Sequence, residues 1–242
     1  MYKLFVLPAA GMLFAALSSA TPVACGTGTV ASYTSTVDSN GGCTEDGLLF
    51  SNFAYIPTSS GTALSLPASA VAISPLLNTS GDGFGFQIVG GYAAGPGGVS
   101  DAILQYEVST VSSAPSLTGL STTFNGTSTG TGIAGVSENY CPGGTSVPPT
   151  TCSGGLRNIF VESSSNGSTL SASNTFAGVS SITVSKDIQV NGGTAGTATI
   201  SSVTNQFQNG PGTGNGTVPE PASLLLIGSG LLGLGVVRRK LG

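Results

Sequence analysis

The sequence has no histidine and no tryptophan, and charged residues make up only 7% of it. Without histidine the chain lacks the usual general base, the commonest transition-metal ligand and every Ser-His-Asp or Cys-His arrangement. Sugar-binding modules usually present aromatic platforms, and tryptophan is not available here to build one. These absences predict a protein that is not an enzyme, with no catalytic residue, no cofactor and no metal ligand.

Positive charge is scarce in the middle of the chain. Only Arg157 and Lys186 are basic between residues 21 and 217, where nine acids lie, so this region carries a net charge of −7. Such a region cannot neutralise a phosphate backbone. We therefore expect no nucleic-acid partner.

What the sequence does contain favours β structure. Glycine occupies 38 positions and 39% of the residues are hydrophobic, while serine and threonine are abundant. Disordered chains are poor in apolar residues and rich in charge, which this chain is not. Glycine, serine, threonine, asparagine and valine favour turns and strands. The composition predicts a folded, all-β domain.

Alternating apolar and polar residues predict the individual strands. Ile182, Val184, Ile188 and Val190 alternate with polar residues, and Lys186 shares the apolar positions. Further candidates are residues 48–55, 84–89, 102–109, 117–124, 156–162 and 198–207. The turn signals are Asn40-Gly-Gly, Gly81-Asp-Gly, Asn125-Gly and Asn191-Gly-Gly.

This pattern predicts about eight to eleven short strands, and an amphipathic helix is not indicated. Short strands separated by glycine-rich turns are typical of an antiparallel β-sandwich, of jelly-roll kind. We expect this domain to cover residues 21–208. Because there is no convincing fixed-period repeat, a solenoid is the weaker alternative.

The N-terminus has the pattern of a secretory signal peptide, residues 1–20. Met1-Tyr2-Lys3 precedes an apolar run over residues 4–17 and the small residues Ser18-Ser19-Ala20. Cleavage is expected between Ala20 and Thr21. The alternatives are an uncleaved helix and a lipoprotein signal with Cys25 as the lipidated residue.

Four cysteines in an exported chain predict two disulfides, for which three pairings exist. The local pairing, Cys25 with Cys43 and Cys141 with Cys152, is favoured because both pairs close short loops rich in small and turn-forming residues. Each bond would contribute ~3 kcal/mol, mostly by restricting the unfolded chain. The spacings do not suit a structural zinc site.

The C-terminal part has three consecutive features after a glycine-rich linker at residues 209–217. Pro219, Glu220 and Pro221 come first, an apolar run over residues 224–237 follows, and a basic cluster of Arg238, Arg239 and Lys240 comes last. As a helix the run would span about 21 Å, less than the ~30 Å hydrocarbon core of a bilayer. It predicts a short transmembrane helix whose basic end stays in the cytoplasm.

These features together resemble the PEP-CTERM domain, which residues 218–242 would form. The resemblance implies recognition by an exosortase, a membrane-embedded transpeptidase-like protease, with cleavage near Pro219–Pro221. Such proteins occur in bacteria that make exopolysaccharide. The opening Cys25-Gly, Gly42-Cys43 and Leu49-Phe50-Ser51-Asn52-Phe53 also resembles PEP-CTERM proteins of soil bacteria such as acidobacteria, which implies no particular activity.

The expected location follows from the two ends. The domain would face the periplasm while tethered to the inner membrane, and would then reach the cell surface or the extracellular matrix. A structural or adhesive role beside exopolysaccharide is the leading hypothesis. A carbohydrate-binding module is the alternative function. For the C-terminal tail, the alternative is a plain membrane anchor that no exosortase cuts.

Other candidate site residues are better explained as surface, turn or core residues than as parts of a functional site. Two facing carboxylates would suit a glycosidase, but no spacing singles out a pair among Glu45, Asp46, Asp82, Asp101, Glu107, Glu138 and Glu162. Asp82 lacks the partner acids of a calcium loop. Four tyrosines are candidate sugar platforms but fit the core better: Tyr33, Tyr55, Tyr92 and Tyr140. Four glycosylation patterns, at Asn78, Asn125, Asn166 and Asn215, are explained by chance in this composition.

Overall fold

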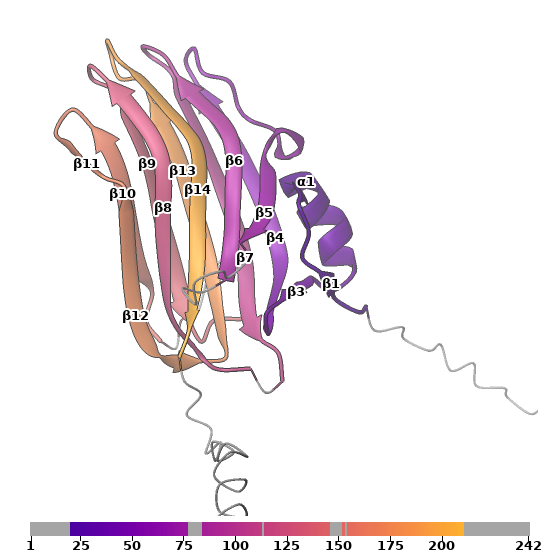
Figure 1. Ribbon diagram of the computed structural model, residues 1–242. Coiled ribbons are helices and arrows are strands. Elements are labelled where there is room, and N and C mark those ends of the chain that lie inside the picture. Colours follow the sequence, from indigo (N-terminus) through magenta and orange to yellow (C-terminus); the bar gives the residue numbers. More distant parts are fainter. Residues whose placement is uncertain (1–19, 77–83, 113, 146–151, 153, 211–242) are drawn as a thin grey trace, which may run out of the picture.

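The structure is a computed structural model that describes residues 20–76, 84–112, 114–145, 152 and 154–210. Its strands form two sheets that stack face to face, with a short helical segment beside one edge (Figure 1). The expected all-β class is confirmed. The predicted signal peptide up to residue 19, the linker beyond residue 210 and the whole tail lie outside the described residues.

The larger sheet has eight strands in the order β1-β3-β4-β7-β13-β9-β10-β11. Its pairs are antiparallel except β1 with β3, which are parallel. The bounds are β1 (Val23–Ala24), β3 (Cys43–Glu45), β4 (Leu48–Ser60), β7 (Val99–Thr110), β9 (Ile133–Pro142), β10 (Arg157–Ser164), β11 (Gly167–Thr169) and β13 (Ser181–Asn191).

The smaller sheet has six strands in the order β12-β8-β14-β6-β5-β2, all antiparallel. The bounds are β2 (Gly28–Thr29), β5 (Ala72–Leu76), β6 (Phe84–Ala94), β8 (Leu117–Thr129), β12 (Ser171–Val179) and β14 (Thr197–Asn209). The chain crosses repeatedly from one sheet to the other, because β7, β9 and β13 belong to the larger sheet and β6, β8 and β14 to the smaller one.

The helical part is short, as the sequence predicts. A capping box between Thr29 and Ser32 starts α1 (Val30–Ser32), and one π-helical stretch, η1 (Tyr33–Val37), continues it. A single 3-10 turn, η2 (Ala68–Ala70), precedes β5. In the part of the chain that the structure describes, helices are too short to cross a membrane. The predicted span 224–237 lies outside those residues.

Aromatic side chains from both sheets fill the space between them. Phe50 on β4 lies 4.5 Å, centroid to centroid, from Phe86 on β6. Tyr106 on β7 stacks on Phe53 at 5.5 Å and meets Phe207 of β14 edge-on at 6.2 Å. Such pairs add about 0.5–1.5 kcal/mol each to the burial of their apolar surface. The core is therefore shared by the two sheets rather than belonging to either.

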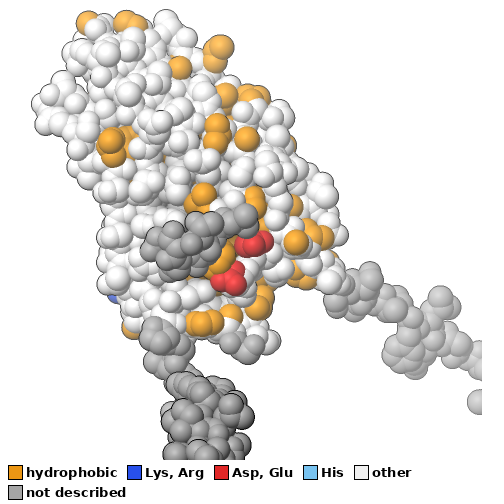
Figure 2. All heavy atoms as spheres, viewed as in Figure 1, with side chains coloured by type: hydrophobic (Ala, Val, Ile, Leu, Met, Phe, Trp, Pro, Cys, Tyr) orange, Lys and Arg blue, Asp and Glu red, His pale blue; other side chains and the backbone are white. Residues whose placement is uncertain are grey.

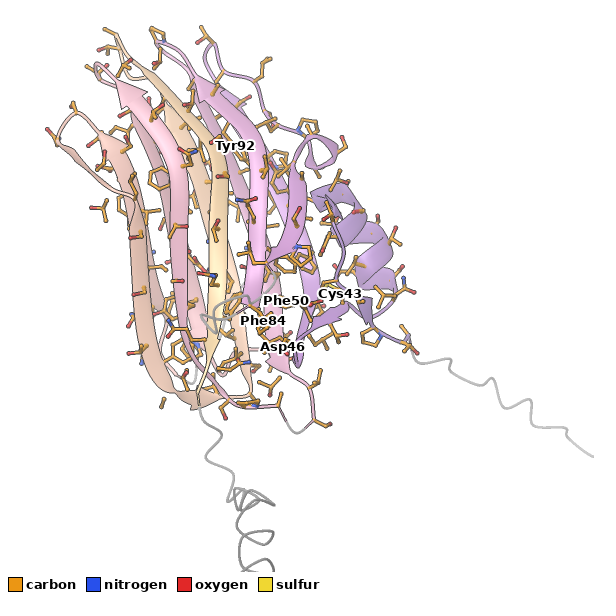
Figure 3. The ribbon with its side chains drawn as sticks, in the orientation of Figure 1. Cys43, Asp46, Phe50, Phe84 and Tyr92 are labelled. Carbon is orange, nitrogen blue, oxygen red and sulfur yellow. A yellow bond between two sulfur atoms is a disulfide. The ribbon has the colours of Figure 1, made fainter. Side chains whose placement is uncertain are left out.

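Both disulfides follow the favoured local pairing. Cys25 is bonded to Cys43 at the start of β3, and Cys141 in β9 is bonded to Cys152. Cys43 is also the register partner of Phe50 on β4, and Figure 3 shows the two side chains near each other. The cysteines therefore fix local chain segments rather than joining a strand of one sheet to a strand of the other.

The seven strands predicted from alternation are all present, and most are longer than predicted. The segment 48–55 extends to Ser60 in β4, and 117–124 extends to Thr129 in β8. Two long strands were missed: β9, where Glu138 interrupts an apolar face, and β12, whose residues are mostly exposed. Neither has the apolar alternation that marks a half-buried strand.

One predicted turn is wrong. Asn125-Gly126 lies inside β8, opposite a bulge where β14 has one extra residue, Ser201. The Ser201 hydroxyl donates a 3.1 Å hydrogen bond to the carbonyl of Asn125. Gly126 is needed there because any side chain would collide with the ring of Phe124. The bulge, rather than a turn, explains this Asn-Gly pair. The predicted Gly81-Asp-Gly turn lies outside the described residues.

Candidate functional site

The residues predicted to direct export and sorting lie at or beyond the limits of the structure. Ala20 and Thr21, the predicted cleavage junction, are exposed at the start of the described region. Pro219, Glu220 and Pro221, with Arg238, Arg239 and Lys240, lie outside it. A protease would therefore reach the N-terminal junction without unfolding the domain.

The acids weighed as a catalytic pair are dispersed over the fold. Asp46 occupies a left-handed turn position between β3 and β4, with φ 42°. Glu107 accepts a 3.0 Å hydrogen bond from the amide of Asn52. Asp82 lies outside the described residues. Glu138 is fully buried, whereas Glu162 is half-buried on β10.

Three of the four candidate tyrosines are buried in the core, and Tyr55 is partly buried against it. Tyr33, Tyr92 and Tyr140 are at most 2% exposed. The hydroxyls of Tyr55 and Tyr92 lie 3.2 Å apart. Tyr33 donates a 2.6 Å hydrogen bond to the carbonyl of Gly26, and burial raises the pKa of its phenol to about 12. Buried tyrosines of this kind cannot present a face to a sugar.

A groove of about 260 Å³ lies on the outer face of the larger sheet, where β13, β9 and β10 run side by side. Gly135 leaves room in it beside the ring of Phe160. The side chains that line this outer groove are Ile133, Ser137, Phe160, Glu162, Asp187 and Gln189. It offers an apolar surface, because Phe160 is 48% and Ile133 43% exposed, beside amide, hydroxyl and carboxyl groups.

Asp187 has an unusual proton affinity for an acid near the surface. Partial burial, followed by a hydrogen bond with Asp101 and the negative charge of that neighbour, raises the pKa of Asp187 to about 6. The sequence offered no signal for this pair, because Asp101 and Asp187 become neighbours only through the β7–β13 register. Among the described residues no group of acids, cysteines and histidines fits a metal ion.

The rest of the surface is largely uncharged. The face in Figure 2 shows scattered hydrophobic side chains and few charged ones. On β8 and β14, threonine hydroxyls pair across the strands, with Thr127 and Thr199 2.9 Å apart and Thr129 and Thr197 2.8 Å apart.

Five polar side chains meet between the sheets and form what we call the buried polar cluster: Tyr106, Thr122, Glu138, Lys186 and Asn205. Each is at most 1% exposed. Lys186 and Glu138 are direct register partners on β13 and β9, and Asn205 and Thr122 are partners on β14 and β8. Two pairs from opposite sheets thus face each other across the core.

The hydrogen bonds of the buried polar cluster converge on one oxygen. Glu138 Oε2 lies 2.5 Å from Lys186 Nζ, accepts from the Thr122 hydroxyl, and lies 3.3 Å from Asn205 Nδ2. Glu138 Oε1 is buried with no hydrogen-bond partner among the described residues. Tyr106 donates its hydroxyl hydrogen to Asn205 Oδ1.

Burial is the largest influence on Lys186. It lowers the pKa of the ammonium group, and the charge of Glu138 opposes that shift. An ion pair this deep contributes little net stability, because desolvation offsets the attraction. One signal for the buried polar cluster is visible in the sequence, namely the position of Lys186 among the apolar residues of its strand. Its contact with Glu138 and Asn205 depends on topology.

Comparisons with known proteins give a match of sequence and several weak likenesses of structure, two of which are described here. Curated proteins give no match. The carbohydrate-binding TmCBM61 in complex with β-1,4-galactotriose has a TM-score of 0.31 and 11% identity, over 62% of this chain and 86% of that one. Endoglucanase 3 of Trichoderma harzianum, from family GH12, has a TM-score of 0.22 and 12% identity, over 68% and 100%. Likenesses this low carry no weight for function.

The sequence match is to the PEP-CTERM protein-sorting motif and covers residues 217–240. It includes Pro219, Glu220 and Pro221, the apolar run and the basic cluster, in the order that the sequence predicted. The chain therefore carries a PEP-CTERM protein-sorting motif at its C-terminal end, and this motif supports export and sorting to the envelope by an exosortase.

Proposed function

We propose that the protein is a non-enzymatic component of the cell surface or extracellular matrix, with a structural or adhesive role beside exopolysaccharide. The PEP-CTERM motif at residues 217–240 is the observation that carries this proposal. The signal peptide is removed between Ala20 and Thr21. The short span at 224–237 holds the domain at the inner membrane until an exosortase cuts near Pro219–Pro221.

The fold supports a structural role. The strands β6, β14, β8 and β12 of one sheet face β7, β13, β9 and β10 of the other. Numbered along the chain, this is the strand order of a jelly roll, an architecture common in capsid and lectin domains. Its long strands and shared aromatic core suit a rigid module outside the cell.

Processing is tested by the intact mass of the protein from cell fractions, with and without the exosortase. We expect a mature form that begins at Thr21 and ends near Pro219–Pro221, found with the envelope or matrix only when the exosortase is present. A form that keeps Arg238 to Gly242 in the inner membrane of both strains would make the tail a plain anchor. That result would remove the main support for a matrix role.

A second candidate function, a carbohydrate-binding module, is favoured by the outer groove. Sugar rings have an apolar face that stacks on exposed rings such as Phe160, and hydroxyl edges that hydrogen-bond to groups such as Gln189 and Glu162. In this chain, which has no tryptophan, the exposed ring of the outer groove is that of Phe160. The outer groove is thus the surface on which adhesion to a polysaccharide would depend.

Cosedimentation with native exopolysaccharide tests both functions, and a glycan array tests the second. Phe160→Ala is expected to abolish glycan binding, while Val89→Ala, on the outer face of the other sheet and 42% exposed, is expected to leave it unchanged. A wild-type protein that neither sediments with exopolysaccharide nor stays with the envelope contradicts the matrix role. An array without a hit counts against a defined glycan ligand.

A further inference from the structure

The buried polar cluster holds the three chemical groups that an amide exchange needs. Lys186 has a primary amine, Asn205 has a carboxamide, and Glu138 has a carboxyl group. All three side chains are 0% exposed. The amine and the amide come from different sheets, on β13 and β14, so that a bond between them would join the two layers.

We propose that Lys186 and Asn205 react within the folded domain to form an isopeptide cross-link, with Glu138 carrying the proton. The lone pair of Nζ attacks Cγ of Asn205. A Cγ–Nζ bond forms, the Cγ–Nδ2 bond breaks, and Nδ2 leaves as ammonia. Glu138 accepts one hydrogen from Nζ and delivers it to Nδ2, so the reaction needs no oxidant, reductant or further reactant.

The position of Glu138 fits this proton transfer. A single oxygen, Oε2, lies 2.5 Å from Lys186 Nζ and 3.3 Å from Asn205 Nδ2. It therefore reaches both the nitrogen that loses a hydrogen and the nitrogen that gains one, as a general acid-base group must. The unpartnered Oε1 leaves the carboxyl group free to carry a proton.

Two neighbours position and activate the amide. Tyr106 donates a hydrogen bond to Asn205 Oδ1, where negative charge develops when an amine attacks the carbonyl. The Thr122 hydroxyl oxygen lies 3.1 Å from Nζ and 3.2 Å from Nδ2, and so holds both nitrogens at one place. Fixing the reactants in this way removes much of the entropic barrier of a reaction between two molecules.

The location also favours the neutral amine, which is the nucleophile. Burial lowers the pKa of Lys186, although Glu138 opposes the shift. Water is kept away from groups that are fully buried, so hydrolysis does not compete. Released ammonia diffuses out of the domain, which makes the cross-link permanent.

The intact mass of the folded full chain, after reduction, alkylation and denaturation, tests the proposal. We expect the wild-type mass to be lower than the sequence mass by one ammonia, about 17 Da. Glu138→Gln is expected to keep the full mass. Glu107→Gln, the matched change at a half-buried glutamate of β7, is expected to show the same loss as wild type. A wild-type chain with its full mass overturns the proposal, whether or not the variants fold.

Trypsin locates the bond, because an asparagine can also lose ammonia by cyclising on its own. Arg157 and Lys186 are the only basic residues between positions 21 and 217. Trypsin does not cut after an amidated lysine, so we expect one uncut peptide that begins at Asn158 and contains both Lys186 and Asn205. Normal cleavage after Lys186 would assign the lost mass elsewhere and overturn the proposal.

Discussion

Lys186 and Asp187 are neighbours on β13, yet they occupy opposite faces of the sheet and opposite chemical environments. Lys186 points between the sheets, where it is 0% exposed and contacts Glu138. Asp187 lines the outer groove on the solvent side. Burial shifts both pKa values toward the neutral form, down for Lys186 and up for Asp187. The two-residue period of a strand thus separates a dry reactive cluster from a wet binding surface.

Removing the lysine from the inner face is expected to have the largest effect. Lys186→Met leaves Glu138 buried and unpaired, and should lower the free energy of unfolding by about 3–5 kcal/mol. Guanidinium unfolding followed by circular dichroism measures this. Lys186→Met combined with Glu138→Leu should recover part of the loss, because the uncompensated charge is gone. If Lys186→Met alone is as stable as wild type, the inner face does not hold Glu138 in the dry environment described above.

Truncating one phenylalanine on each face compares how much the inner and outer faces of the sheets contribute to stability. Phe86→Ala removes a ring that is 1% exposed and should lower the free energy of unfolding by about 3–5 kcal/mol. Phe160→Ala removes a ring that is 48% exposed and should change it by less than about 0.5 kcal/mol. Thermal or chemical unfolding of both variants provides the test. A large loss from Phe160→Ala would mean that the outer groove is part of the core.

The charge on the outer face should show itself as a small dependence of stability on pH. The pKa of Asp187 is about 6 in the folded protein, above its ordinary value of 3.8, so the folded state holds the proton more tightly. The stabilisation is present below pH about 4 and is lost as the pH rises through about 6. Melting temperatures measured from pH about 4 to about 6 test this: Asp187→Asn should remove the fall in stability over that range.

Glu162→Gln is the matched control, because Glu162 lines the same groove. It should leave the dependence on pH in place, since Asp101 is the acid that interacts with Asp187. A profile that is the same in wild type and Asp187→Asn would assign the effect to another group. A profile lost in both variants would mean that the three acids titrate together.

Alternation in the sequence was enough to predict the all-β class and seven of the long strands. It also placed Lys186 among the apolar positions of its strand, which is where the structure has it. The turn at Asn125-Gly was wrong because this pair also fits the strand opposite a bulge, and only the register of β14 decides between the two. Local pairing of the cysteines was predictable because short loops favour it.

The contacts of the candidate sites were not predictable from the sequence. Glu138 lies on β9, a strand whose alternation it interrupts, and Asn205 lies on β14 in the other sheet. Their meeting with Lys186 depends on strand order and register, which no single segment encodes. The outer groove likewise brings together side chains of β9, β10 and β13, which are distant in sequence.

The burial of Lys186 has a consequence for the life of the protein outside the cell. Between residues 21 and 217 it is the only lysine, so the folded domain presents no lysine amine to its surroundings. The remaining cation, Arg157, lies in β10 and donates a 3.1 Å hydrogen bond to the carbonyl of Thr175. Proteases that cut after lysine, and aldehydes that react with lysine amines, therefore have no accessible lysine to attack in this domain.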